Sequence, residues 1–159
     1  MTRILVVEDS RMISTYLKTS IEAELGHSVT VARDLAQTRA LLRPKGKDSG
    51  SEEARFSLAV VDLSLPDAPD GQVVDLVLEH GLTVVVLTSE MNTEIRDQIV
   101  SKGAADFVIK SKDSARQVKE IIQRLLLNKE ETILVVDDSD FIRKTVVNML
   151  TTYGLRTLE

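Results

Sequence analysis

The chain has 159 residues, and 43% of them are apolar, which is enough for one compact domain with a core, alone or with a further fragment. Acidic residues number 25 against 20 basic ones, and the basic residues form no dense block, so we expect no direct contact with nucleic acid or an anionic membrane. Cysteine is absent, which excludes disulfides and thiolate metal sites. Neither a signal peptide nor an apolar run of the roughly 18 residues that span a membrane is visible, so we expect a soluble, cytoplasmic protein.

Short apolar segments alternate with helical periodicity between residues 4 and 127. The patterns predict strands over residues 4–7, 29–32, 82–87 and 107–109, and one that starts at Leu58 and is halted by Pro66. Helices are predicted over residues 11–25, 35–43, 72–79, 91–102 and 114–127. Residues 45–55 contain turn formers and almost no apolar residue, which predicts a surface loop. Strands that alternate with helices in this way are typical of a parallel sheet covered on both sides.

Asp62 is the unusual residue of the third strand. Its neighbours Leu58, Ala59, Val60 and Val61 are apolar and predict a strand buried on both faces. A carboxylate is costly inside such a strand and tolerated at its carboxyl end, which is also where open α/β sheets bind ligands. We therefore expect Asp62 to point out of the sheet into a functional crevice.

Polar residues also close three other predicted strands. Glu8 and Asp9 follow the first strand, Thr88 follows the fourth and Lys110 follows the fifth. Because the carboxyl ends of a parallel sheet lie on one edge, these residues can converge with Asp62. Three carboxylates repel one another unless a cation lies between them, and Mg²⁺ suits such hard oxygen ligands. A lysine and a hydroxyl opposite suit a phosphoryl group, so the pattern indicates phosphoryl transfer to a carboxylate.

The C-terminal part of the chain repeats its beginning. Residues 133–139 read ILVVDDS and match ILVVEDS at residues 4–10, and a helical stripe follows each copy. A second copy therefore starts here, with Asp137 and Asp138 as its acidic pair, but a fragment of this length cannot bury a core of its own. We predict a first domain over residues 1–127, a short linker over 128–131 and the truncated N-terminal part of a second domain over 132–159.

The ordered set of strand-end residues, together with the repeated ILVV(E/D)DS, resembles the receiver domain of bacterial two-component response regulators, the CheY-like family. The resemblance covers residues 2–127 in full and residues 132–159 as the start of a second, tandem receiver. It implies a flavodoxin-like, doubly wound α/β fold with a five-stranded parallel sheet, plus a partial β-α repeat at the C-terminus. It also implies a signalling module rather than an enzyme, with self-catalysed phosphoryl transfer and dephosphorylation as its only chemistry.

The resemblance implies a role for each residue of the acidic site. Asp62 corresponds to the phosphoacceptor, and Lys110 to the lysine that pairs with the phosphoryl oxygens. The family's cofactor is Mg²⁺, and the ligands implied here are Glu8, Asp9, Asp62 and the backbone carbonyl of Ser64. The function implied is Mg²⁺-dependent acceptance of a phosphoryl group on Asp62.

The same resemblance implies switch residues and partners. Thr88 and Phe107 correspond to the family's switch pair, while Ser64 and Glu90 occupy positions that tune dephosphorylation. The implied partners are a sensor histidine kinase or a histidine phosphotransfer protein, and an output domain in the full-length protein, commonly a diguanylate cyclase after tandem receivers. The helix over residues 114–127 is a candidate surface for a homodimer.

Some features depart from the family pattern, and two alternative functions stay open. Ser111 stands where proline usually follows the lysine, Glu8 replaces an aspartate, and the turn over residues 66–71 is longer than usual. The first alternative is a pseudo-receiver that is not phosphorylated and acts as an interaction or dimerisation module; retention of the acceptor, hydroxyl and lysine argues against it. The second is a phosphohydrolase with an aspartate nucleophile, but such enzymes usually have a second aspartate where this chain has Ser64.

Overall fold

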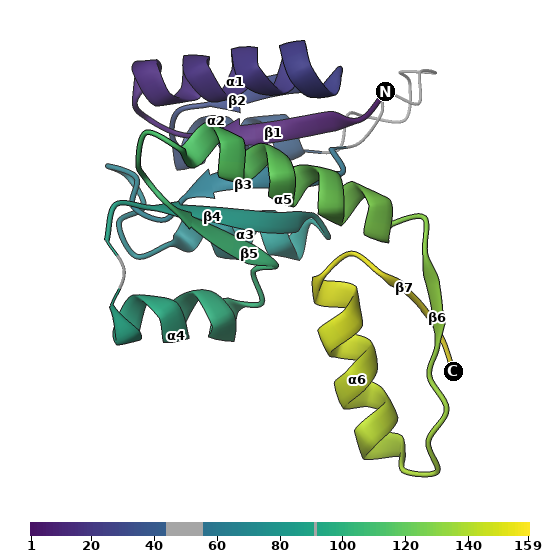
Figure 1. Ribbon diagram of the computed structural model, residues 1–159. Helices are drawn as coiled ribbons and strands as arrows, with labels where there is room; N and C mark the ends of the chain where they lie inside the picture. Colours follow the sequence, from purple (N-terminus) through teal and green to yellow (C-terminus); the bar gives the residue numbers. More distant parts are fainter. Residues whose placement is uncertain (44–55, 91) are drawn as a thin grey trace.

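The computed structural model describes residues 1–43, 56–90 and 92–159. Helices and strands alternate along these residues (Figure 1). Their bounds are β1 Arg3–Val7, α1 Arg11–Leu25, β2 Ser28–Ala32, α2 Leu35–Leu42, β3 Leu58–Asp62, α3 Gln72–Glu79, β4 Thr83–Thr88, α4 Thr93–Lys102, β5 Asp106–Ile109, α5 Ser114–Asn128, β6 Thr132–Leu134, α6 Asp140–Thr152 and β7 Arg156–Leu158. The predicted loop over residues 45–55 lies outside the described residues. In the part of the chain that is described, no helix combines the length and apolar character needed to cross a bilayer.

The first five strands form one parallel sheet in the order β2-β1-β3-β4-β5. This order confirms the predicted doubly wound, flavodoxin-like fold. The chain leaves β1 for β2 at one edge and returns to β3 on the other side of β1, so the strand order reverses there. Ligands of open α/β sheets bind at the carboxyl ends of the strands beside such a reversal. The topology therefore places the carboxyl ends of β1 and β3 at the expected crevice.

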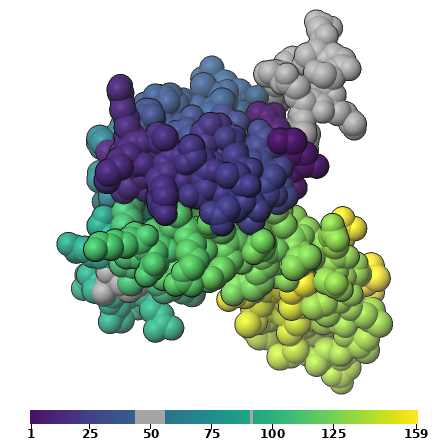
Figure 2. Space-filling view, turned by 45° about the horizontal axis from the view of Figure 1, so that its top comes forward, coloured from purple at the N-terminus to yellow at the C-terminus, as the bar shows by residue number. Residues whose placement is uncertain are grey.

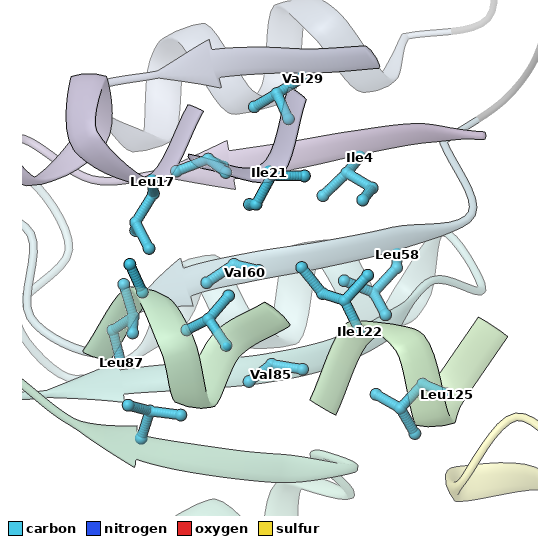
Figure 3. Packing of buried hydrophobic residues seen from close by; sticks show 14 of the residues in the cluster. Ile4, Leu17, Ile21, Val29, Leu58, Val60, Val85, Leu87, Ile122 and Leu125 are labelled. Carbon is cyan, nitrogen blue, oxygen red and sulfur yellow. The ribbon is translucent and has the colours of Figure 1, made fainter. Parts of the chain in front are cut away.

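Alternate residues of the buried strands face two separate apolar layers. Ile4 and Val6 of β1 pack against α1 and α5, whereas Leu5 and Val7 belong to the layer covered by α2, α3 and α4. The helices accordingly lie on both sides of the sheet (Figure 1). Figure 3 shows the first layer, in which side chains from α1, α5 and the strands point toward one another. Burial on both faces explains why these strands read as continuous apolar runs.

Short polar residues fix the helix ends, and they account for the small differences from the predicted bounds. Ser10 caps α1 by accepting a hydrogen bond from the Ile13 amide, and Gly26 ends the helix at a φ of 66°. The helix predicted over residues 91–102 begins instead at Thr93, because the Asn92 side chain accepts a hydrogen bond from the Ile95 amide and caps it there. β3 likewise ends at Asp62, ahead of the proline.

The last three elements form a separate small body, which we call the C-terminal unit (residues 132–159). Strands β6 and β7 pair in parallel across α6, as β1 and β2 do across α1. The predicted β-α repeat is thus present, and β7 is an element that the sequence pattern did not predict. The unit lies beyond the end of α5 (Figures 1 and 2), and the Asn128 side chain donates a hydrogen bond to the Tyr153 carbonyl at 2.9 Å.

One face of the C-terminal unit is uncovered in the described chain. Leu134 and Val136 align with Leu5 and Val7 of the first copy, which are fully buried, yet their exposed fractions are 65% and 81%. None of the residues of α6 is fully buried. The unit therefore has the local structure of the first copy but lacks, among the described residues, the helices and third strand that bury β1.

The core predicts which substitutions in α5 are costly. Leu125 is fully buried in the first layer, whereas Leu127 on the same helix is 66% exposed. We expect Leu125→Ala to lower the free energy of unfolding by about 3 kcal/mol through lost burial and a residual cavity. The control Leu127→Ala should change it by less than about 0.5 kcal/mol. Urea denaturation followed by circular dichroism measures both; equal effects would contradict this packing.

Candidate functional site

Three charged side chains meet at the carboxyl edge of the sheet. The Lys110 ammonium lies 2.6 Å from Asp62 Oδ2 and 2.9 Å from Glu8 Oε2. Glu8 and Asp62 are both buried, and they stand at the ends of the neighbouring strands β1 and β3. The structure thus brings together a glutamate, an aspartate and a lysine that are far apart in the sequence.

The backbone of the outer strands delivers the lysine to this point. Lys110 follows the last residue of β5, and its amide donates a hydrogen bond to the Thr88 carbonyl at 2.8 Å. This bond extends the pairing of β4 with β5 by one residue beyond Ile109. The side chain then crosses the end of β4 to reach Asp62 on β3.

The pKa values of Glu8 and Lys110 reflect competing effects. Burial raises the pKa of Glu8 above its ordinary value of 4.5, and the negative charge of Asp62 adds to the rise, although the lysine opposes it. Burial alone lowers the pKa of the Lys110 ammonium, but the hydrogen bond and charge of Asp62, together with those of Glu8, outweigh burial and leave the pKa raised. The site therefore favours a charged lysine.

A third carboxylate completes a set of oxygens that fits a hard divalent cation. One carboxylate oxygen each of Glu8, Asp9 and Asp62 lies within 4.8 Å of the other two. Asp9 is exposed, and the buried Glu8 Oε2 has the Lys110 ammonium as its partner at 2.9 Å. Such oxygens match the preference of Mg²⁺ for a few carboxylates and several waters. This cluster is the one that the sequence predicted.

The other predicted site residues lie around this cluster in distinct ways. The Ser64 amide donates to Asp62 Oδ1 at 3.2 Å, while its side chain is exposed. The Thr88 hydroxyl donates to the Glu90 carbonyl at 2.7 Å, so it is turned toward the loop between β4 and α4. Phe107 is half-buried against the layer of α2, α3 and α4.

A pocket of about 380 Å³ opens beside Asp62 between the loops that follow β3 and β4. Its lining includes the predicted residues Ser64, Thr88 and Glu90. Ile95 and Gln98 of α4 also line it, and sequence reasoning missed both. Gln98 Nε2 donates to the Asp70 carbonyl at 3.1 Å and so ties α4 to the loop after β3. No sequence signal marks these two residues, because only the fold brings α4 over the pocket.

The second acidic pair has no comparable surroundings. Asp137 accepts a hydrogen bond from the Ser139 amide, and Asp138 is exposed. The basic neighbour here is Arg143, which donates to the Asp137 carbonyl and pairs with Asp140. An open hollow of about 450 Å³ lies beside Asp137. Within the described C-terminal unit no strand corresponds to β3, so no counterpart of Asp62 joins this pair.

Comparison with known proteins decides the family. The response regulator receiver domain model matches residues 4–123, which span β1 to α5 and contain the whole cluster. The chain belongs to this family. The receiver prediction is thereby confirmed for the first domain, whereas the match ends before residue 132, and a second receiver there stays a prediction.

Individual relatives add detail to this receiver assignment. The virulence transcriptional regulatory protein PhoP of Salmonella typhimurium strain LT2 is 32% identical over 115 residues, which cover 69% of this chain and 46% of that protein. The chain thus spans less than half the length of the PhoP proteins that it matches. A solved structure described as a probable two-component system response regulator/GGDEF domain protein is 33% identical, with a TM-score of 0.77 over 99% of this chain and 60% of the other. The Mn²⁺-bound form of the response regulator Rcp1 is 25% identical, with a TM-score of 0.64 over 76% and 91% of the two chains.

Proposed function

We propose that this receiver accepts a phosphoryl group on Asp62 in a Mg²⁺-dependent reaction and relays the signal to an output domain. The donor is a sensor histidine kinase or a histidine phosphotransfer protein. The observation that carries the proposal is the Lys110 ammonium held between the buried carboxylates of Asp62 and Glu8, with Asp9 beside them. A structural ion pair needs only one carboxylate. A cluster of three carboxylates with a single lysine leaves excess negative charge, which suits a bound cation.

The residues of the site have separate tasks in this reaction. A carboxylate oxygen of Asp62 forms a bond to the phosphorus of the donor, while the bond from phosphorus to the leaving group breaks and its electron pair departs with that group. Lys110 then neutralises oxygens of the phosphoryl group in place of its present contact with Asp62. Glu8, Asp9, Asp62 and the Ser64 carbonyl would hold Mg²⁺, which supplies positive charge to the phosphoryl oxygens when bound. The Mn²⁺-bound state of Rcp1 supports a divalent cation in a related domain.

The signal leaves the site through the loop after β4. The Thr88 hydroxyl is bound to the Glu90 carbonyl in this structure, and we infer that it exchanges this partner for a phosphoryl oxygen. Such an exchange moves the loop between β4 and α4. Phe107 is only half-buried, so its side chain has room to change its burial when this loop moves. Ser64 and Glu90 line the pocket beside Asp62, which supports a role for their side chains in tuning access of the hydrolytic water.

Phosphorylation can be measured directly by intact mass after incubation with acetyl phosphate. We expect the native chain to gain one phosphoryl group in Mg²⁺ and none after chelation of the metal. Asp62→Asn should abolish the gain, because the nucleophile is lost. Asp9→Asn should slow it by at least about tenfold, since a ligand of the cation is removed.

The matched control is Asp97→Asn, which removes an exposed carboxylate of α4 away from the cluster and should leave the gain unchanged. A folded native chain that gains no mass would contradict the proposal and favour the pseudo-receiver alternative. Continuous turnover of acetyl phosphate without an adduct would favour the phosphohydrolase alternative. A lasting adduct of one phosphoryl group distinguishes the receiver from both.

We infer further that the C-terminal unit is the start of a second receiver, completed by chain beyond Glu159. The match to the GGDEF domain protein supports this, because it extends over 99% of the present chain and therefore beyond the receiver family match at residue 123. That neighbour also favours a GGDEF output domain over the transcriptional output suggested by the name of PhoP. The exposed Leu134 and Val136 are the positions that the missing helices and strand would cover.

Equivalent substitutions in the two copies test this second inference. Leu5→Ala should destabilise the present chain by about 3 kcal/mol, whereas Leu134→Ala should have an effect below about 0.5 kcal/mol. In a chain extended to the length of the GGDEF relative, Leu134→Ala should become as costly as Leu5→Ala. Denaturant unfolding monitored in both chains measures the change. An unchanged effect of Leu134→Ala in the longer chain would contradict a second receiver.

A further inference from the structure

The turn after Lys110 holds a hydrogen-bond arrangement around one buried hydroxyl. Ser111 follows the lysine, and its amide donates to Ser114 Oγ at 2.6 Å. The Ser114 hydroxyl lies 2.9 Å from the Ser111 carbonyl and 3.3 Å from the Ile109 carbonyl, and it donates its one proton toward them. Ser114 is the first residue of α5 and is buried. Its hydroxyl therefore contacts the backbone on both sides of Lys110.

These bonds have the form of a reciprocal helix cap, in which a side chain inside the helix reaches back to an amide that precedes it. A capping side chain precedes the helix and accepts a hydrogen bond from an amide in its first turn. The Ser114 hydroxyl instead lies inside the helix and accepts from the Ser111 amide, which precedes α5. The residue at the usual capping position, Asp113, makes no such bond. The Ser111 hydroxyl accepts from the Asp113 amide at 3.2 Å, so the two serines cap the start of α5 reciprocally, and the Ser114 half of this cap fixes the peptide after Lys110.

The position of this turn decides where the lysine ammonium can reach. A lysine side chain has many rotamers, so its ammonium is held at two carboxylates only if the backbone that carries it is fixed. The Lys110 amide is fixed to the Thr88 carbonyl, and the peptides before and after the residue are fixed by the Ser114 hydroxyl. A serine at residue 111 has an amide proton for this bond, which a proline lacks.

We propose that Ser114 is a positioning residue for phosphoryl transfer, acting through the Ser111 amide to hold Lys110 at Asp62 and Glu8. The inference rests on the proposed phosphorylation of Asp62 and names a residue that supports it. Ser114 touches neither the carboxylates nor the donor, so its loss affects the lysine and leaves the cation ligands in place. The rate of phosphorylation and the affinity for Mg²⁺ should consequently respond differently.

The experiment compares four variants by their initial rate of phosphorylation with acetyl phosphate, their Mg²⁺ affinity and their thermal unfolding. We expect Ser114→Ala to be phosphorylated on the order of tenfold more slowly, because the lysine is no longer held in place. Ser114→Cys keeps roughly the size of the side chain but replaces the hydroxyl with a weak acceptor, so its phosphorylation should also be slow. This variant provides the test if Ser114→Ala does not fold. Ser114→Thr restores the hydroxyl and should return the rate to within about twofold of native.

Ser111→Ala is the matched control, since it removes a hydroxyl from the same turn but keeps the amide that binds Ser114. It should be phosphorylated at the native rate. Mg²⁺ affinity should stay within about twofold of native in all four variants.

A native rate for folded Ser114→Ala and Ser114→Cys would overturn the positioning role while the proposed function stands. A parallel loss of Mg²⁺ affinity, or no recovery in Ser114→Thr, would also overturn it. Absence of phosphorylation in the native chain is a separate result that overturns the proposed function itself.

Discussion

The contacts of one lysine with two buried carboxylates are the constraint on which the site depends. Glu8 and Asp62 lie side by side at the ends of β1 and β3, where burial raises the pKa of Glu8 and the negative charge of Asp62 adds to that rise. Lys110 offsets these effects from β5, which is separated from β3 by β4. Neighbouring strands are about 4.8 Å apart, so a side chain from β5 must cross two such spacings to reach β3, and only a long side chain can do so. The sheet order therefore requires a lysine or arginine at the end of β5, and removal of its charge would leave two buried carboxylates uncompensated.

The same interaction explains how a small chemical change can alter a distant surface. In the proposed reaction, a phosphoryl group on Asp62 would give the lysine and the Thr88 hydroxyl new acceptors, and the hydroxyl would have to leave the Glu90 carbonyl to use them. We expect the loop after β4 and the pocket beneath α4 to rearrange in response, since Gln98 also ties α4 to the loop after β3. The C-terminal unit lies at the other end of the sheet, where a Cβ on Gly154 would stand 3.7 Å from Thr83 Oγ1 at the start of β4. β4 thus runs from Thr88, the proposed switch residue, to the region of the C-terminal unit.

Much of this arrangement was predictable from the sequence because parallel strands are buried on both faces. Continuous apolar runs marked the strands, and the polar residue that ends each run marked the carboxyl edge of the sheet. Side-chain direction was not predictable: nothing in the sequence shows that Thr88 binds Glu90, or that Gln98 reaches Asp70. β7 was missed because its three residues, Arg156–Leu158, are too few and too polar to form a recognisable run. The bond between Ser111 and Ser114 depends on the local shape of a turn, which residue types alone do not fix.

The most direct test of the account is the pKa of the Lys110 ammonium in the metal-free protein, measured by NMR titration of its side chain. We expect a value above the ordinary 10.5, because the charges and hydrogen bonds of Asp62 and Glu8 outweigh the effect of burial. We also expect this pKa to fall in Asp62→Asn, which keeps the shape of the site and removes the charge. A pKa at or below 10.5 in the native chain would contradict the account, because the lysine would then be buried without the ion pairs that hold it.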